Sequence, residues 1–194
     1  MKLRMPSLLF LLSLAACAAA PVQLYTLASP ATAVAPAAAP RWLDVMPVGV
    51  PAAVDVPQLV VRHGTGELAL LERQQWAAPL SAEIRSALVA ELARQAGVRD
   101  VHGLPAPADV PLSRLRLDVQ AFETVPGRHV RWEAVWSLRG VGAPTPALTC
   151  VFSAEEPAAA GHAAAVEAHQ RVLRRLAGQL ASALKAPGAC PATP

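Results

Sequence analysis

Hydrophobic side chains recur at helical spacing in two segments of the chain. The first segment carries a large apolar residue at every fourth position: Leu80, Ile84, Leu88 and Leu92. Pro79 is tolerated in a first helical turn and Gly97 suits a helix end, so this spacing predicts a helix over residues 77–96. The second segment predicts a helix over residues 163–185, which Pro187 and Gly188 would end. Its apolar positions are Val166, Leu173, Leu176, Leu180 and Leu184.

Apolar and polar residues alternate in several other segments, as in strands with one buried face. The clearest case places five apolar residues on one face: Val130, Trp132, Ala134, Trp136 and Leu138. We interpret Trp132 and Trp136 as core residues rather than as a ligand site, because they share this apolar face. Further strands are expected at 24–27, 41–50, 58–62, 67–72, 114–120 and 148–153.

From residue 41 onward the expected order of elements is β-β-β-α-β-β-β-α. Each amphipathic helix needs a sheet face to cover, which favours one domain over residues 41–186 and a flexible tail at 187–194. The fold class is therefore α/β, with a single mixed, largely antiparallel sheet packed with two long helices.

The chain begins with a short basic and apolar leader over residues 1–16. Its apolar stretch is too short to cross a bilayer and ends in Leu14-Ala15-Ala16-Cys17. This arrangement resembles a bacterial lipoprotein signal, in which Cys17 becomes the acylated first residue of the mature protein. In such signals alanine after the cysteine, here Ala18, favours the outer membrane. The alternative is an ordinary signal peptide with a chance cysteine.

Residues 17–40 are mostly alanine and proline, which predicts a tether. As a flexible coil it would have an r.m.s. span of ~25–30 Å. The segment 24–27 interrupts it with strand-forming residues, so we expect this segment to dock at the edge of the folded domain.

Charge and cysteine content narrow the function classes. The formal net charge is +3, and Lys2 and Arg4 would leave with the leader, so the mature chain offers no electrostatic footprint for nucleic acid. In an exported protein Cys150 and Cys190 are candidates for one disulfide, if their Cα atoms lie within ~4.4–6.8 Å. Two free thiols are the alternative.

No catalytic pattern stands out along the chain. The sequence has no Gly-x-Ser-x-Gly, no phosphate-binding Gly-x-x-x-x-Gly-Lys and no His pair at metal-ligand spacing. We expect neither a metal nor a cofactor, apart from a covalent lipid on Cys17. Arg171, Arg174 and Arg175 cluster on the last expected helix, where they form either a solvated face or a contact with anionic headgroups or an acidic partner.

Several short motifs, in their order and spacing, resemble the PqiC/YmbA-like lipoproteins, the ABC-type transport auxiliary lipoprotein components. They are the cysteine motif at Cys17, Tyr25-Thr26-Leu27, residues 56–62, residues 75–80, residues 119–123, residues 132–138, and the closing helix with Leu173, Leu176 and Ala177.

The resemblance implies a fold similar to the anticodon-binding-like type of the TolB N-terminal domain. It also implies a non-enzymatic lipoprotein on the outer membrane, facing the periplasm, that assists an MCE/ABC-type system for lipid transport between membranes. MCE-domain or ABC transporter subunits would be its partners, and the family likeness suggests a homo-oligomer. A lipid-binding carrier and a lipidated envelope hydrolase are the alternatives.

Gln58, Arg62 and Trp76 form the densest cluster of family-like residues, so they are candidates for a partner interface or a lipid-facing groove. The alternative is structural: Arg62 pairs with a carboxylate or carbonyl, and Trp76 packs the first long helix onto the sheet.

Overall fold

The computed structural model describes residues 21–30, 40–105, 110–142, 147–186 and 188–192. The leader, Cys17 and Ala18 lie outside the described residues. Within them, neither helix combines the length and the apolar character needed to span a membrane.

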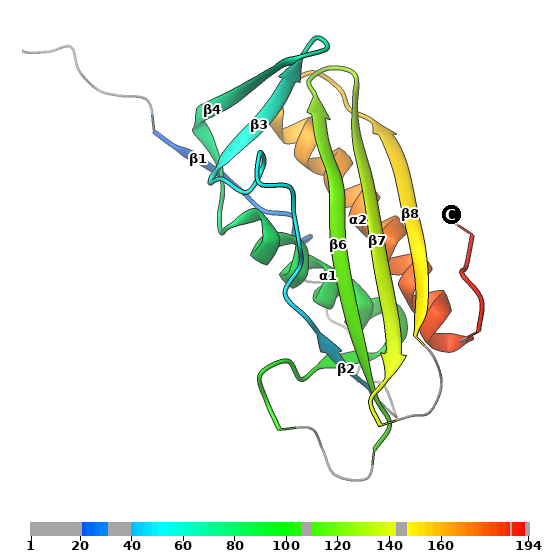
Figure 1. Cartoon of the computed structure of the whole chain (residues 1–194). Helices are drawn as coiled ribbons and strands as arrows, with labels where there is room; N and C mark the ends of the chain where they lie inside the picture. Colours follow the sequence, from blue (N-terminus) through cyan, green and yellow to red (C-terminus); the bar gives the residue numbers. More distant parts are fainter. Residues whose placement is uncertain (1–20, 31–39, 106–109, 143–146, 187, 193–194) are drawn as a thin grey trace, which may run out of the picture.

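The main layer is a five-stranded sheet in the order β5-β2-β6-β7-β8 (Figure 1). Its strands are β2 (Arg41–Val45), β5 (Val98–Asp100), β6 (Leu112–Val125), β7 (His129–Gly140) and β8 (Leu148–Pro157). Strands β6, β7 and β8 form an antiparallel meander, whereas β2 runs parallel to both β5 and β6. The alternation seen in the sequence therefore places one face of each long strand in the core.

A second sheet of three strands stands beside the first, in the order β1-β4-β3. Its strands are β1 (Gln23–Tyr25), β3 (Gln58–His63) and β4 (Glu67–Trp76). The expectation of a single sheet was wrong. The expected strand 41–50 ends at Val45, and Pro47, Pro51 and Pro57 follow before β3. Met46 and Gly49 still donate to the carbonyls of Leu115 and Leu117 on β6, so the chain follows the first sheet as far as Gly49. Because proline cannot donate to a sheet ladder, Pro51 and Pro57 do not extend this pairing, and β3 starts a new sheet with β4.

Two helices, α1 (Leu80–Ala96) and α2 (His162–Lys185), pack against each other on one face of the five-stranded sheet (Figure 1). Helix α1 ends at Gly97, which adopts the left-handed conformation at φ 64° and donates its N–H back to Ala93. Helix α1 starts three residues later than expected, because Pro79 takes the position before the helix rather than its first turn.

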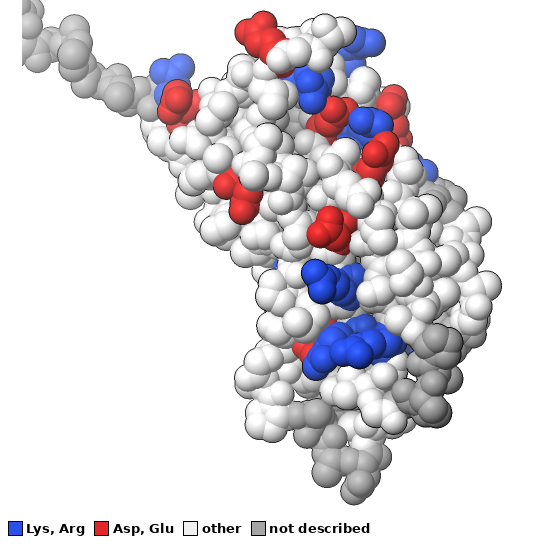
Figure 2. Space-filling view, in the orientation of Figure 1, with Lys and Arg blue, Asp and Glu red and all other residues white. Residues whose placement is uncertain are grey.

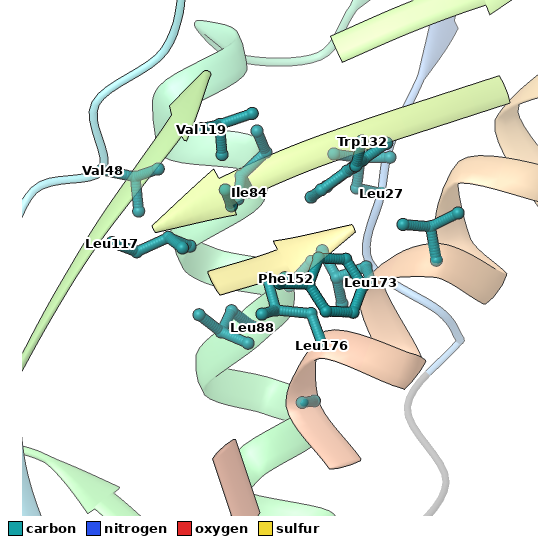
Figure 3. Packing of buried hydrophobic residues seen from close by; sticks show 14 of the residues in the cluster. Leu27, Val48, Ile84, Leu88, Leu117, Val119, Trp132, Phe152, Leu173 and Leu176 are labelled. Carbon is teal, nitrogen blue, oxygen red and sulfur yellow. The ribbon is translucent and has the colours of Figure 1, made fainter. Parts of the chain in front are cut away.

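The core lies between the helices and the sheet. Figure 3 shows sheet residues such as Trp132 and Phe152 gathered with Leu88 of α1 and Leu176 of α2. The two buried indoles of β7 are hydrogen-bonded: Trp132 donates to Nδ1 of His169 at 2.7 Å, and Trp136 donates to the Oε1 of Gln179 at 2.8 Å. The two tryptophans are therefore core residues, as their alternation predicted, and their polar atoms have partners.

His169 is the most deeply buried titratable group of the core. Its ring stacks on Phe122 with centroids 4.2 Å apart, and its Nε2 lies 2.9 Å from the hydroxyl of Thr124. Since Nδ1 accepts from Trp132, the Nε2–H donates to Thr124, which fixes the neutral tautomer. Burial lowers the pKa of His169 to about 3.

Cys150 and Cys190 form a disulfide, with their Cα atoms 5.6 Å apart. Cys150 is a buried residue of β8, and Cys190 follows the end of α2. The bond therefore holds the C-terminal segment beside the last strand of the sheet. The described residues 188–192 belong to the segment for which the sequence predicted a flexible tail.

Candidate functional site

The N-terminal segment docks on the second sheet. Strand β1 pairs in parallel with β4, with Tyr25 opposite Trp76, and the carbonyl of Tyr25 accepts the N–H of Ala77 at 2.8 Å. Leu27, two residues further on, is 1% exposed and joins the core. Strand β1 begins one residue before, and ends two residues before, the docking strand expected at 24–27.

Both helices hold this segment through polar side chains. Glu83 of α1 is buried, and its Oε2 accepts the hydroxyl of Thr26 at 2.8 Å and the N–H of Leu27 at 2.9 Å. From α2, Gln170 donates to the carbonyl of Thr26 at 3.0 Å and Arg174 donates to the hydroxyl of Ser29 at 3.3 Å. We call Glu83, Gln170 and Arg174 the clamp.

Glu83 is well placed for this role. It lies in the first turn of α1, where the helix dipole favours a negative charge. The hydrogen bonds from Thr26 and Leu27 give its buried carboxylate the partners that a buried charge needs. Removing the carboxylate would leave the Leu27 N–H without this acceptor, so the docked segment depends on it.

A groove separates the β3–β4 hairpin from β6. A cavity of about 150 Å³ opens there, between Val60 and Arg62 of β3 on one side and Phe122 and Glu123 of β6 on the other. Strand β6 is irregular at this place, because its register with β7 shifts between Val119 and Ala121. The groove is thus built where β6 departs from regular pairing.

A chain of alternating charges borders this groove. Arg62 pairs with Glu123 at 3.0 Å, Glu123 with Arg131 at 3.0 Å, and Arg131 with Glu133 at 2.6 Å. Burial would raise the pKa of Glu123, but the hydrogen bonds and charges of Arg131 and Arg62 outweigh it and hold that pKa below its usual value. Within the described chain, the buried Nε of Arg62 has no hydrogen-bond acceptor.

The three residues proposed as an interface do not share one surface. Trp76 is 5% exposed and meets the ring of Phe122 edge-on, with centroids 6.0 Å apart, so its indole packs in the core. Gln58 is half-buried beside it at the start of β3, opposite Gln75. Arg62 lies four residues along the strand, about 13 Å away. Trp76 is therefore a packing residue rather than an interface residue. A partner interface in this region would use Arg62 and the groove beside it.

The sequence matches the family described as ABC-type transport auxiliary lipoprotein component over residues 25–181. The chain belongs to this family. The auxiliary lipoprotein has no match among curated proteins.

Among the solved structures that share the fold of this auxiliary lipoprotein are two crystal structures. The first is the crystal structure of an uncharacterized protein, with a TM-score of 0.68 and 20% identity, covering 85% of this chain and 99% of that one. The second, from Xanthomonas campestris, has a TM-score of 0.61 and 20% identity, covering 83% of this chain and 94% of its own. At these identities the similarity shows the fold alone.

The arginines of α2 in the auxiliary lipoprotein are engaged within the chain. Arg171 donates to the carbonyl of Pro157 at 2.7 Å, Arg175 pairs with Glu156 at 2.9 Å, and Arg174 belongs to the clamp. These contacts tie α2 to the end of β8 and to the N-terminal segment. Neither a purely solvated face nor a headgroup contact is therefore needed to explain this cluster.

Sequence reasoning missed the clamp. Glu83 stands within the apolar stripe of α1, between Leu80 and Ala87. A charged residue at such a position is the one signal that could have revealed the clamp. Gln170 gave no signal. Arg174 was noted only for its charge, because its contact with Ser29 bridges residues 145 positions apart.

Proposed function

We propose that this protein is a lipid-anchored subunit on the outer membrane, acylated at Cys17 and facing the periplasm, that assists an MCE/ABC-type intermembrane lipid transport system. Its role is that of a non-enzymatic scaffold that binds the partner subunits. Membership of the auxiliary lipoprotein family supports the link with an ABC-type transporter.

The docked N-terminal segment is the observation that carries the scaffold role. Five residues separate Cys17 from Gln23, the first residue of β1. Even fully extended, that stretch spans at most roughly 20 Å. An acylated Cys17 would therefore keep the domain close to the membrane. The distance between anchor and domain would be shorter than a free tether of residues 17–40 would allow. A scaffold gains from this restriction, since a confined domain meets membrane-bound partners at a high effective concentration.

The groove beside Arg62 is our candidate for the partner contact. It combines apolar walls from Val60 and Leu68 with the charge pair of Arg62 and Glu123, and the Nε of Arg62 offers a buried donor. The Arg62 side chain is 30% exposed, so a partner carbonyl or carboxylate that reaches its guanidinium would gain a hydrogen bond to a charged group, about 1.5–3 kcal/mol.

The anchor is tested by cell fractionation of a Cys17→Ala variant, which should leave the membrane fraction. A Cys17→Ala protein that still sediments with membranes would disprove the anchor. The variant Ala18→Asp keeps the cysteine and serves as the matched control, because it should move the protein to the inner membrane without releasing it.

The clamp is tested by hydrogen exchange of the Leu27 amide. The variant Glu83→Ala should raise its exchange rate at least tenfold, since the amide loses its buried acceptor. Glu67→Ala, at an exposed position of β4, is the control and should leave the rate unchanged. Unchanged protection in Glu83→Ala would show that β1 pairing alone holds the segment.

The partner contact is tested by affinity purification from envelopes. Arg62→Ala should lower the yield of co-purifying ABC or MCE subunits, whereas Arg128→Ala, in the β6–β7 turn, should not. Equal recovery with both variants would remove the groove from the proposal and leave the anchor untouched.

A further inference from the structure

Three arginines gather on the face of the five-stranded sheet that the helices leave open. Arg114 and Arg116 are on β6, and Arg139 is on β7, directly opposite Arg114 and diagonal to Arg116. Figure 2 shows the blue side chains that gather low on this face, over β6 and β7. Opposed like charges at this spacing destabilise a sheet, so their grouping calls for an explanation other than folding.

One of the three charges is balanced. The Nε of Arg114 donates to Asp44 at 2.6 Å, and His102 contacts the other oxygen of the same carboxylate at 2.8 Å. Burial would raise the pKa of Asp44, but the hydrogen bonds from His102 and Arg114 outweigh it, so the pKa lies below its usual value. Asp44 is therefore ionised at neutral pH and already fully engaged.

The other two charges have no carboxylate partner among the described residues. Within the described part of the chain, Arg116 and Arg139 form no ion pair, and both are exposed. Asp118, the next residue of β6 on this face, lies against the backbone of Gly49 and forms no ion pair with a described residue. The face thus presents two unpaired guanidinium groups, which are well suited to bind the oxygens of a phosphate.

These arginines line a cleft rather than a flat surface. A cavity of about 240 Å³ is bordered by Met46 and Ser137 together with the three arginines. A second cavity of about 400 Å³ adjoins it and shares Met46 and Arg114. Its other walls include Val101, Leu104 and Leu112, and Leu104 is 67% exposed. A basic compartment therefore opens beside an apolar one.

We propose that this double cleft binds a phosphate-bearing anionic amphiphile such as an anionic phospholipid. The phosphate lies on Arg116 and Arg139, and the apolar part lies along Met46, Leu104 and Leu112. The two volumes together fall in the usual range of small-molecule sites, ~300–1,000 Å³. Strands β6 and β7 are interior strands of the sheet, so a partner segment has no free strand edge to pair with here. Both observations favour a small amphiphile over a protein segment.

The site adds ligand binding to the scaffold role and does not depend on it. It lies at the end of the domain away from β1 (Figure 1). Its failure would leave the anchor at Cys17 and the groove at Arg62 as they stand, because neither experiment on those features involves these arginines.

Met46 offers a direct probe of the cleft. It borders both cavities, and it is the sole methionine after Cys17, since Met1 and Met5 lie in the leader. The full chain, held in amphipol and labelled with ¹³C at the methionine methyl groups, is titrated with short-chain phosphatidylglycerol below its micelle concentration. We expect a saturable shift of the Met46 methyl signal.

Matched variants and ligands show whether the shift of the Met46 signal comes from binding in this cleft. Arg116→Gln combined with Arg139→Gln should weaken binding at least tenfold, whereas Arg128→Gln, an exposed arginine of the β6–β7 turn, should not change it. Leu104→Ser should weaken the lipid titration severalfold without changing the effect of inorganic phosphate. Short-chain phosphatidylcholine, which has no net charge, should bind at least tenfold more weakly than phosphatidylglycerol.

Four results would overturn the proposal. They are a Met46 signal that does not saturate, equal binding by the double arginine variant, equal binding of phosphatidylcholine, and inorganic phosphate that binds as tightly as the lipid. The last result would reduce the cleft to a phosphate site. Saturation by an acidic peptide, with none by the lipid, would assign the cleft to a partner protein instead.

Discussion

The two faces of the five-stranded sheet are built from the same strands and differ in how completely their polar groups are paired. On the helix-covered face, the buried indole N–H of Trp132 donates a hydrogen bond to the buried ring of His169. On the open face, Arg116 and Arg139 have no carboxylate among the described residues. The covered face therefore satisfies its buried polar groups within the fold, whereas the open face keeps two guanidinium groups that we propose bind an anionic ligand.

Truncation on the covered face should have the largest effect. Trp132→Ala removes a fully buried ring and leaves the Nδ1 of His169 without its donor, so it should lower the free energy of unfolding by about 3–5 kcal/mol. Chemical denaturation measures this. A loss below about 1 kcal/mol would mean that the helices do not depend on this face.

Loss of the disulfide should have the next largest effect on stability. Cys150 and Cys190 are 40 residues apart, and closing a loop of that length stabilises a fold by roughly 2–4 kcal/mol. The variant Cys190→Ser should lower the melting temperature measured by circular dichroism. The wild type with a reducing agent should match it, and a variant as stable as the oxidised protein would contradict the prediction.

The covered face should also make stability depend on pH. The folded state keeps His169 neutral down to a pKa of about 3, whereas the unfolded chain binds a proton near pH 6.5. Stability should therefore fall as pH drops below 6.5, by roughly 1.4 kcal/mol per pH unit from this group. His169→Gln keeps an acceptor for Trp132 and should flatten the slope of unfolding free energy against pH by that amount. An unchanged slope would show that another group controls it.

The open face should give the smallest effect, with the opposite sign. Arg139→Gln removes a charge that stands opposite Arg114, so it should raise stability by a few tenths of a kcal/mol. Arg128→Gln is the control and should have no effect. A clear loss of stability in Arg139→Gln would mean that this arginine supports the fold, and the contrast between the two faces would disappear.

Local patterns were enough to predict most of the elements. Both helices follow from apolar spacing, and Gly97 ends α1 because a single residue sets the left-handed turn. The tryptophans of β7 were assigned to the core by alternation alone. These features depend on neighbours within a few residues, which a sequence displays directly.

The missed features depend on contacts between distant residues. Strand β5 is three residues long and exists because β2 pairs with it, and no alternation can be seen over so short a stretch. The division into two sheets depends on where the proline-rich segment after Val45 leads the chain. Glu83 reaches Thr26 across 57 positions, and Arg139 meets Arg114 only through the register of β6 and β7. The contacts of the candidate sites are therefore tertiary.

The disulfide has one more consequence, at the free edge of the larger sheet. Strand β8 is the last strand of that sheet, and its Val151 side chain is 73% exposed, which is a hazard for aggregation. Gln179 of α2 donates to the carbonyl of Val151 at 3.4 Å and to that of Pro191, next to Cys190, at 3.0 Å. The cross-link thus keeps the chain end where it helps to occupy this edge, and growth of the sheet into fibres by strand addition is hindered there.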